Sequence, residues 1–330
     1  MQKNEKAEAL RGYLNSGLEY FPEKGKVGIF TTNRAGPENT PLERAVRAFY
    51  EKNPYHSVPP PGSLQSRIEA LERDWANWVE IPSLRGKRTL DVGCGSGFNL
   101  VLHGALASVA VGMDVSLPSL ENARRYCEKE KVSERVLLIH GDICRQYLPP
   151  ASFDLITCIG VLHHIPRHRE ALRNMARLLD EGGYLLLGIY HPAGRLRHRV
   201  KRAIFLFFAG RNVTRRVRWA RLFFPIQKEA TKYRIPEEIY VRDSYAAPVE
   251  KAFSVRQVQE LFHRVGLTLL QVRPSPGIGF REPVAALTAL RKDEISESSL
   301  PPDVKLADRE LQRMGRHHYW CLAKKESPQI

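Results

Sequence analysis

Short apolar runs separated by polar turns follow one another through the middle of the chain. Five such runs begin at about Arg88, Val109, Val136, Phe153 and Tyr184. Short apolar runs bounded by turn residues are typical of buried strands, and the longer segments between them have the length of helices. This alternation predicts an α/β fold with a mostly parallel sheet.

Amphipathic helices are predicted ahead of these strands. The first begins at Pro41 and stops before Pro54, because the residue before a proline disfavours the helical conformation. The second runs from Leu64 to about Trp78, after a stiff proline-rich spacer over 58–62.

The last part of the chain has the pattern of two further strands and their helices. A helix over 254–265 leads to a sixth strand over 267–273, and a final strand spans 317–324. Between these two strands, helices are expected near 283–292 and 304–314.

The first strand of the series runs directly into a turn rich in glycine. Asp91 is followed by Gly93, Gly95 and Gly97. Glycine accepts positive φ and lets a ligand lie against bare backbone, and a helix starting at about Gly97 points its amides at the same place. The dinucleotide fingerprint Gly-x-Gly-x-x-Gly needs a third glycine where this chain has Phe98. A carboxylate at Asp91 would repel a pyrophosphate and suits a cationic ligand.

Acidic residues follow the next two strands at corresponding places. Asp114 ends the second strand. In nucleotide-binding folds a carboxylate about 20 residues after the glycine turn accepts hydrogen bonds from the hydroxyls of a ribose, and Asp114 lies at a similar distance. Asp142 follows the third strand, and the fourth continues into His163-His164. Together with the glycine turn, these segments resemble the class I S-adenosylmethionine (AdoMet) methyltransferases over roughly residues 87–190.

The resemblance implies which residues hold AdoMet. It implies Asp114 at the ribose, Asp142 at the adenine amino group with an apolar neighbour packing the ring, and residues at the end of the fourth strand at the methionine part. The implied cofactor-binding residues are Asp91, Gly93, Cys94, Gly95, Gly97, Asp114, Val115, Asp142, Ile143 and Ile159. Cys94 could also be a nucleophile, but a small residue is needed in the turn, which favours a structural role.

The resemblance also implies a Rossmann-like, doubly wound, seven-stranded sheet with an antiparallel last strand. We expect four parts along the chain. They are an N-terminal extension with lid helices (1–85), the AdoMet-binding core (86–192), a basic helical insertion after the fifth strand (193–252) and the completion of the sheet (253–330).

Charge is distributed unevenly, and the insertion carries most of the excess. The chain of 330 residues has a net charge of +15. Asp and Glu are absent from 182–228, while 193–228 contains eleven Lys and Arg alternating with apolar runs such as 204–208. This pattern predicts a pair of basic amphipathic helices. Three roles are open: an element at a membrane surface, a lid over the substrate, or a patch for nucleic acid or another polyanion.

Methyl transfer from a sulfonium depends mainly on alignment and exclusion of water. A general base is needed only where the acceptor must lose a proton. The candidates at the strand ends are His163, His164, Tyr190 and His191. A packing role for the two adjacent histidines is the alternative. No metal site is predicted, because Pro166 separates the pair His164 and His168 and a third ligand is missing.

We therefore expect an AdoMet-dependent methyltransferase that acts on a small, apolar or lipid-like acceptor. The alternatives are an RNA-modifying methyltransferase, since tRNA-modifying relatives have similar His-His turns, and a non-catalytic AdoMet-binding protein. Five scattered cysteines without a CxxC pair and the polar start of the chain predict a cytoplasmic protein. Peripheral membrane contact through 193–228 is one of the three roles that the basic insertion leaves open. The sequence specifies neither the acceptor atom nor an oligomeric state.

Overall fold

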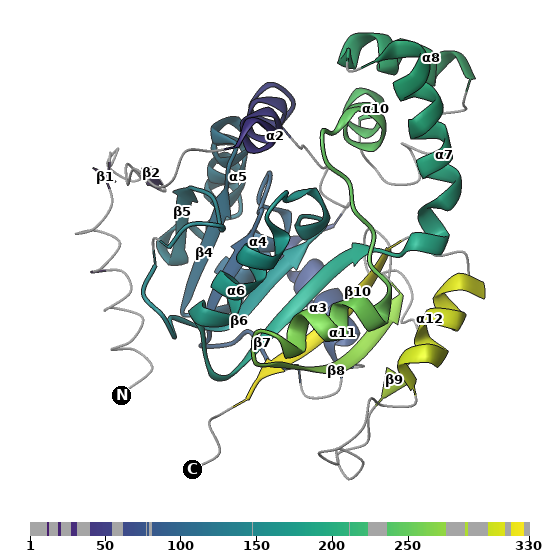
Figure 1. The fold of residues 1–330 in the computed structure, drawn as a ribbon. Helices are drawn as coiled ribbons and strands as arrows, with labels where there is room; N and C mark the ends of the chain where they lie inside the picture. Colours follow the sequence, from purple (N-terminus) through teal and green to yellow (C-terminus); the bar gives the residue numbers. More distant parts are fainter. Residues whose placement is uncertain are drawn as a thin grey trace.

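The computed structural model describes most of the chain. The described residues are 12, 19–20, 28–31, 40–54, 62–76, 78, 81–146, 148–210, 212–223, 236–274, 288–289, 303–313 and 318–326. Figure 1 shows one twisted sheet with helices on both sides and a group of helices, α7, α8 and α10, that projects beyond it.

The sheet contains the seven expected strands in a doubly wound order. From one side to the other they are β5 (Val136–His140), β4 (Val109–Asp114), β3 (Arg88–Val92), β6 (Phe153–Ile159), β7 (Leu179–Tyr190), β10 (His318–Lys325) and β8 (Leu267–Pro274). The first five are parallel, and β10 is antiparallel to both of its neighbours. The expected Rossmann-like sheet with its antiparallel last strand is therefore confirmed.

Short strands that the sequence did not predict extend the sheet at both edges. β2 (Ile29–Thr31) pairs in parallel with β5, β1 (Glu19–Tyr20) pairs with β2, and β9 (Thr288–Ala289) pairs with β8. Two or three residues are too few to show an alternating pattern. The helix expected near 283–292 is wrong at 288–289, which form β9, and the rest of that range lies outside the described residues.

Two layers of helices bury the sheet. One face is covered by α3 (Leu64–Trp75), α4 (Phe98–Leu106) and α5 (Leu117–Lys129), and the other by α6 (His168–Leu178), α11 (Val255–His263) and α12 (Asp303–Arg313). Their starts follow from local chemistry: Ser254 and Gln257 form a capping box at α11, and Ser116 caps α5.

The N-terminal helix α2 (Pro41–Lys52) lies over the edge where the parallel strands end. It ends just before Pro54, as the sequence predicts. The Ser116 hydroxyl at the start of α5 donates to the carbonyl oxygen of Tyr50 at 3.1 Å, and the backbone N–H of Leu117 donates to the carboxylate of Glu51. The helix is thereby joined to the carboxyl end of β4.

The described residues between β7 and α11 form three helices. They are α7 (Pro192–Ala209), α8 (Val213–Phe223) and α10 (Glu237–Ala246). They share a small apolar core of their own, made of Phe205, Val217, Ala220, Val241 and Tyr245. Among the helices in the described part of the chain, none is long and apolar enough to cross a membrane.

Candidate functional site

The turn at the carboxyl end of β3 has three glycines in backbone conformations that other residues rarely adopt. Gly93, Gly95 and Gly97 have φ values of 68°, 52° and 83°, in the left-handed region that favours glycine. A Cβ on Gly93 would lie 2.3 Å from Cγ2 of Val161, so the turn packs closely against the segment after β6. Gly97 is the N-cap of α4, as the sequence indicates. The helix amides therefore point toward the turn.

Asp114 ties the end of β4 to this turn. Its carboxylate accepts the backbone N–H of Gly95 at 2.9 Å and that of Ser116 at 2.9 Å. Burial raises the pKa of Asp114, although these two N–H donors act in the opposite sense. The side chain is thus held beside the glycine turn with acceptor capacity left on both oxygens. This suits the pair of ribose hydroxyls that the family binds there.

Asp142 lies two residues beyond the end of the next strand, β5, whose last residue His140 pairs with Asp114. The Asp142 carboxylate accepts the backbone N–H of Cys144 at 2.8 Å, which shapes the turn after β5. The following Ile143 is buried in the core. The implied adenine contacts therefore lie at the same edge of the sheet as the glycine turn, since parallel strands end together.

Asp91 is a buried carboxylate without a cation. It is 3% exposed, and the Thr157 hydroxyl donates to it at 2.8 Å. Burial raises its pKa to about 7, the nearby Asp114 acts in the same direction, and the Thr157 hydrogen bond opposes them. No ion pair to it is found among the residues that the structure describes. Such a group fits a ligand that brings its own positive charge, as AdoMet does.

Cys94 has the structural role that the sequence favoured. It is buried, and a Cβ on Gly112 of β4 would lie 3.0 Å from its Sγ. Burial, and next the charge of Asp114, raises the pKa of the Cys94 thiol well above its usual value. The thiol is therefore protonated and a poor nucleophile.

Aromatic rings from four elements meet beside the glycine turn. His163 and His164 follow β6, Tyr190 ends β7, His318 starts β10 and Tyr50 comes from α2. The ring centroids of His163 and Tyr190 are 4.0 Å apart, those of His163 and His164 4.3 Å, and those of Tyr50 and His164 6.1 Å. We call these five residues the ring cluster. It brings together three of the four predicted catalytic candidates.

The two histidines of the ring cluster differ in their hydrogen bonds. Nδ1 of His164 lies 2.7 Å from the carbonyl oxygen of Val249. A carbonyl can only accept, so Nδ1 carries a proton, and in the neutral ring Nε2 is an acceptor. His163 is fully buried, and neither of its ring nitrogens has a hydrogen-bond partner in the described part of the chain. Burial, followed by the neighbouring His164 and His318, lowers the pKa of His163 well below its usual value.

His191 does not belong to the ring cluster. Side chains alternate between the faces of a strand, so His191 points away from the side that Tyr190 occupies. Its Nε2 lies 3.1 Å from Oδ1 of Asp308 on α12, and its ring packs against Tyr319. The prediction that it could act on the substrate is therefore not supported by its position.

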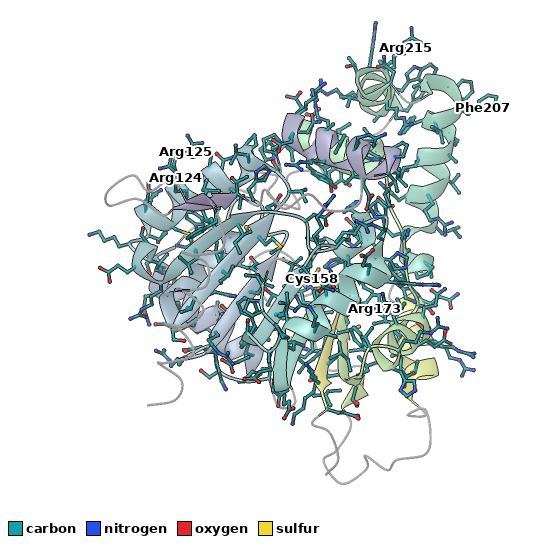
Figure 2. All side chains as sticks on the ribbon, turned by 60° about the vertical axis from the view of Figure 1, so that its left-hand side comes forward. Arg124, Arg125, Cys158, Arg173, Phe207 and Arg215 are labelled. Atoms are coloured by element: carbon teal, nitrogen blue, oxygen red, sulfur yellow. The ribbon has the colours of Figure 1, made fainter. Side chains whose placement is uncertain are left out.

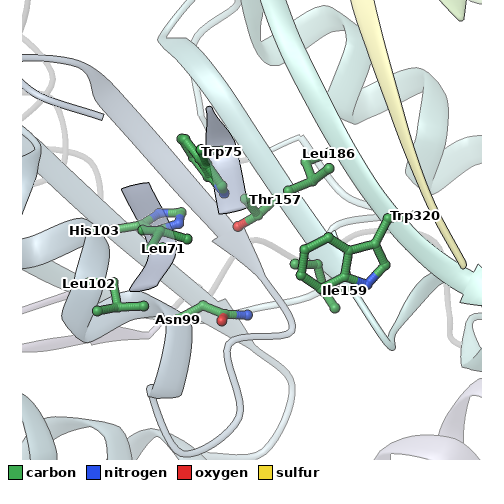
Figure 3. A pocket seen from close by; sticks show the side chains of 9 residues that line it. All are labelled: Leu71, Trp75, Asn99, Leu102, His103, Thr157, Ile159, Leu186 and Trp320. Carbon is green, nitrogen blue, oxygen red and sulfur yellow. The ribbon is translucent and has the colours of Figure 1, made fainter. Parts of the chain in front are cut away.

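An apolar hollow lies below the ring cluster on the same face of the sheet. Figure 3 shows its lining: Leu71, Trp75, Asn99, Leu102, His103, Thr157, Ile159, Leu186 and Trp320. Leu186 lies on the same side of β7 as Tyr190, and Trp320 on the same side of β10 as His318. Thr157 lines the hollow and also donates a hydrogen bond to Asp91. The hollow, on the face of the sheet that α3 covers, therefore adjoins one of the predicted cofactor-binding residues.

The insertion is anchored at the ring cluster through one acid. The guanidinium of Arg195 on α7 lies 4.0 Å from the centroid of the Tyr190 ring. Arg195 also forms an ion pair with Glu250, and His198 and Arg202 lie within 3.6 Å and 3.5 Å of the same carboxylate. Burial alone would raise the pKa of Glu250, but the His198 hydrogen bond and the two arginine charges lower it to about 2.

Three residues around the site were not predicted from the sequence to take part in it: Thr157, His318 and Glu250. Thr157 is a polar residue inside an otherwise apolar strand, and His318 alternates with Trp320 in the last strand, so both carried a local indication. Glu250 carried none, since its partner Arg195 lies far away along the chain.

The comparisons with known proteins agree with this geometry. A model of the methyltransferase domain matches residues 90–187. The chain is 34% identical over 119 residues to 27-O-demethylrifamycin SV methyltransferase of Amycolatopsis mediterranei, covering 34% of this chain and 44% of that protein. It is 32% identical over 106 residues to a ubiquinone biosynthesis O-methyltransferase of Coxiella burnetii, covering 31% and 43%. The match thus spans less than half the length of these two relatives.

A longer match is found in a protein of Encephalitozoon cuniculi that is named as a methyltransferase, ECU09_1500. It is 31% identical over 167 residues, which cover 49% of this chain and 69% of that protein. The structure of PKMT2 from Rickettsia typhi aligns with a TM-score of 0.56 at 17% identity, covering 82% of this chain and 57% of that one, a likeness of fold. The chain therefore belongs to the class I S-adenosylmethionine-dependent methyltransferases.

Proposed function

We propose that this protein transfers the methyl group of AdoMet to a hydroxyl oxygen of a small, apolar acceptor bound at the ring cluster. The observation that carries the proposal is the meeting of Tyr50, His164 and Tyr190 directly beside the glycine turn. Two relatives that match the core are named for O-methylation, which favours oxygen as the acceptor atom.

AdoMet, when bound, supplies a methyl group on a positively charged sulfur. Asp91 would hold the cationic end of this cofactor, and Asp114 and Asp142 would hold its nucleoside. Val161 packs directly against Gly93, so the glycine turn and the segment that leads to the ring cluster lie side by side, and a cofactor held at this turn would lie close to the ring cluster. Well-oriented reactants can save about 7–11 kcal/mol of the barrier, so holding the two molecules in line is the main task of these residues.

His164 is placed to accept the proton of the acceptor hydroxyl. The Val249 carbonyl holds the proton on Nδ1, so Nε2 has a lone pair in the neutral ring. When the hydroxyl oxygen takes the methyl group, its proton would pass to Nε2 of His164, and the electron pair of the broken C–S bond would stay on the sulfur of AdoMet. His163, whose lowered pKa makes it a weak base, would instead pack the acceptor and exclude water together with Tyr190.

The test is to follow labelled methyl from AdoMet into separate cell fractions. The purified protein is incubated with small-molecule, lipid and RNA fractions, and we expect label in small organic-soluble molecules. Label confined to RNA would contradict the proposal in favour of RNA modification. Absence of label from every fraction while AdoMet still binds would favour a non-catalytic role.

A pair of variants then tests the assigned base. His164→Asn keeps a side-chain N–H near the Nδ1 position for the Val249 carbonyl but has no base, so we expect the methylation rate to fall by about 100-fold or more. His163→Asn, at the neighbouring position, is the matched control and should reduce the rate less. An equal loss in both variants, or a rate for His164→Asn that keeps the normal pH profile, would show that His164 is not the base.

A further inference from the structure

Exposed apolar side chains gather on two helices of the insertion. Of the ten large apolar side chains that are exposed in the described part of the chain, eight lie on α7 and α8. They are Leu196, Val200, Ile204, Leu206, Phe207, Phe208, Leu222 and Phe223. Contiguous exposed apolar surface of this kind marks an interaction site rather than ordinary surface.

The side chains on α7 form a continuous stripe. Leu196, Val200, Ile204 and Phe207 are spaced by four, four and three residues, which places them within about a quarter of the helix circumference. Phe207 is 83% exposed, and in Figure 2 it points away from the body of the molecule.

Stacked rings extend the stripe from α7 to α8. Phe208 stacks on Trp219 with centroids 5.4 Å apart, and Trp219 stacks on Phe223 at 5.4 Å. The opposite side of α7 faces the protein, where Phe205 packs in the apolar core of the insertion and Arg195 forms its ion pair with Glu250. The orientation of the exposed face is therefore set by the fold. We call Leu196, Val200, Ile204, Phe207, Phe208, Leu222 and Phe223 the apolar face.

Exposed basic residues lie on the same two helices as the apolar face, in a stretch of the sequence that contains no acidic residue. Arg199 of α7 and Arg215 and Arg218 of α8 are exposed, and Figure 2 shows Arg215 at the outer end of the insertion. Asp and Glu are absent from 182–228. Basic and apolar groups thus share one surface, which is the composition of helices that lie in a membrane interface.

We propose that the apolar face of α7 and α8 docks on the surface of an anionic lipid bilayer. Phe207, Ile204 and Val200 insert at the boundary between head groups and acyl chains, and Arg215 and Arg218 contact lipid phosphates. Docking uses helices that lie on the bilayer, in keeping with the absence of a spanning helix among those described.

The same features disfavour two other occupants. RNA binding uses charged and hydrogen-bonding groups with planar stacking surfaces, whereas Leu196, Val200 and Ile204 are aliphatic and can neither stack on bases nor pair with phosphates. A second copy of the chain would bring the same basic surface against itself in a two-fold interface. Like charges would then face each other across the contact.

The test is flotation of the full chain with vesicles of phosphatidylcholine, with and without phosphatidylserine. We expect binding that requires phosphatidylserine and weakens with salt. Replacing Val200, Ile204 and Phe207 together by Gln should weaken binding by about 1000-fold, since each inserted side chain contributes roughly a factor of ten. Arg215→Gln with Arg218→Gln should weaken it by about 20-fold, roughly fivefold for each charge.

Leu42→Gln is the matched control, because Leu42 is an exposed leucine on α2, away from the apolar face. It should float as the unchanged protein does, and thermal unfolding should show that all variants are folded. Asp91→Asn should also float normally, so the outcome is independent of the proposed function. The proposal is overturned if the triple variant still floats, if it loses tRNA binding instead, or if it merely converts a dimer to a monomer.

Discussion

Two buried carboxylates, one in the candidate cofactor site and one under the insertion, have opposite surroundings. Asp91 is 3% exposed and receives a hydroxyl hydrogen bond from Thr157, and its pKa is raised to about 7. The Glu250 side chain is 5% exposed and lies against Arg195, Arg202 and His198, and its pKa is lowered to about 2. Similar burial therefore has opposite electrostatic results.

The difference separates a binding group from a structural one. Burying a charge is unfavourable unless a partner compensates it. In the insertion the protein supplies the cations, so Glu250 holds α7 against the ring cluster. At the cofactor site the protein supplies no cation to Asp91 among its described residues, and a cationic ligand would complete the pair.

The largest effect is expected for Glu250→Gln. This change leaves Arg195 and its neighbours buried without a counter-charge, and breaking a buried pair in this way costs about 3–5 kcal/mol. Thermal or urea unfolding would measure the loss. Glu237→Gln, which breaks a more exposed ion pair with Arg221, is the control and should cost about 1 kcal/mol or less. Equal losses in the two variants would remove the distinction drawn for Glu250.

Asp91→Asn should act on binding and leave stability intact. Removing one member of a buried charge pair costs about 2–4 kcal/mol, so AdoMet affinity should fall by roughly 30- to 1000-fold. Above pH 7 the ligand-free variant should be at least as stable as the unchanged protein, because an uncompensated charge has been removed. Calorimetric titration and thermal unfolding would check both. Unchanged AdoMet affinity would contradict the assignment of Asp91 to the cofactor.

The smallest effect concerns pH. Because the pKa of Asp91 is raised from 3.8 to about 7, the folded protein holds a proton that the unfolded chain lacks between these values. Asp91 therefore favours the folded state most below pH 3.8, and this contribution is lost as pH rises toward 7. A cationic ligand needs the ionised form, so AdoMet affinity should fall by up to about tenfold per pH unit below 7. Titrations at several pH values would show it.

Asp91→Asn is the control for this pH dependence, since AdoMet itself has titratable groups. In the variant, AdoMet affinity should depend less on pH below 7, because the contribution from ionisation of Asp91 is gone. If both proteins show the same slope below pH 7, the carboxyl of Asp91 is not the titrating group, and its contrast with Glu250 is then wrong.

The sheet, and the edge of it at which the predicted cofactor-binding residues lie, could largely be predicted from the sequence. Asp91 and Asp114 lie in the last residues of their apolar strands and Asp142 comes just after the next strand, and parallel strands end at one edge. A local pattern therefore sufficed to place three side chains together. The local pattern also predicted the last strand, whose antiparallel direction came from the family resemblance, but not the two-residue β9, which is too short to carry a pattern.

The acceptor side of the site depends on contacts between distant segments. The ring cluster joins Tyr50, His164 and Tyr190 from three separate parts of the chain, and strand alternation turns His191 to the other face. The local pattern showed that 193–228 is basic and amphipathic. Only the tertiary structure shows that Arg195 is buried in an ion pair with Glu250 while Phe207 is exposed. The reason is that the burial of a side chain depends on which distant residues the fold brings against it.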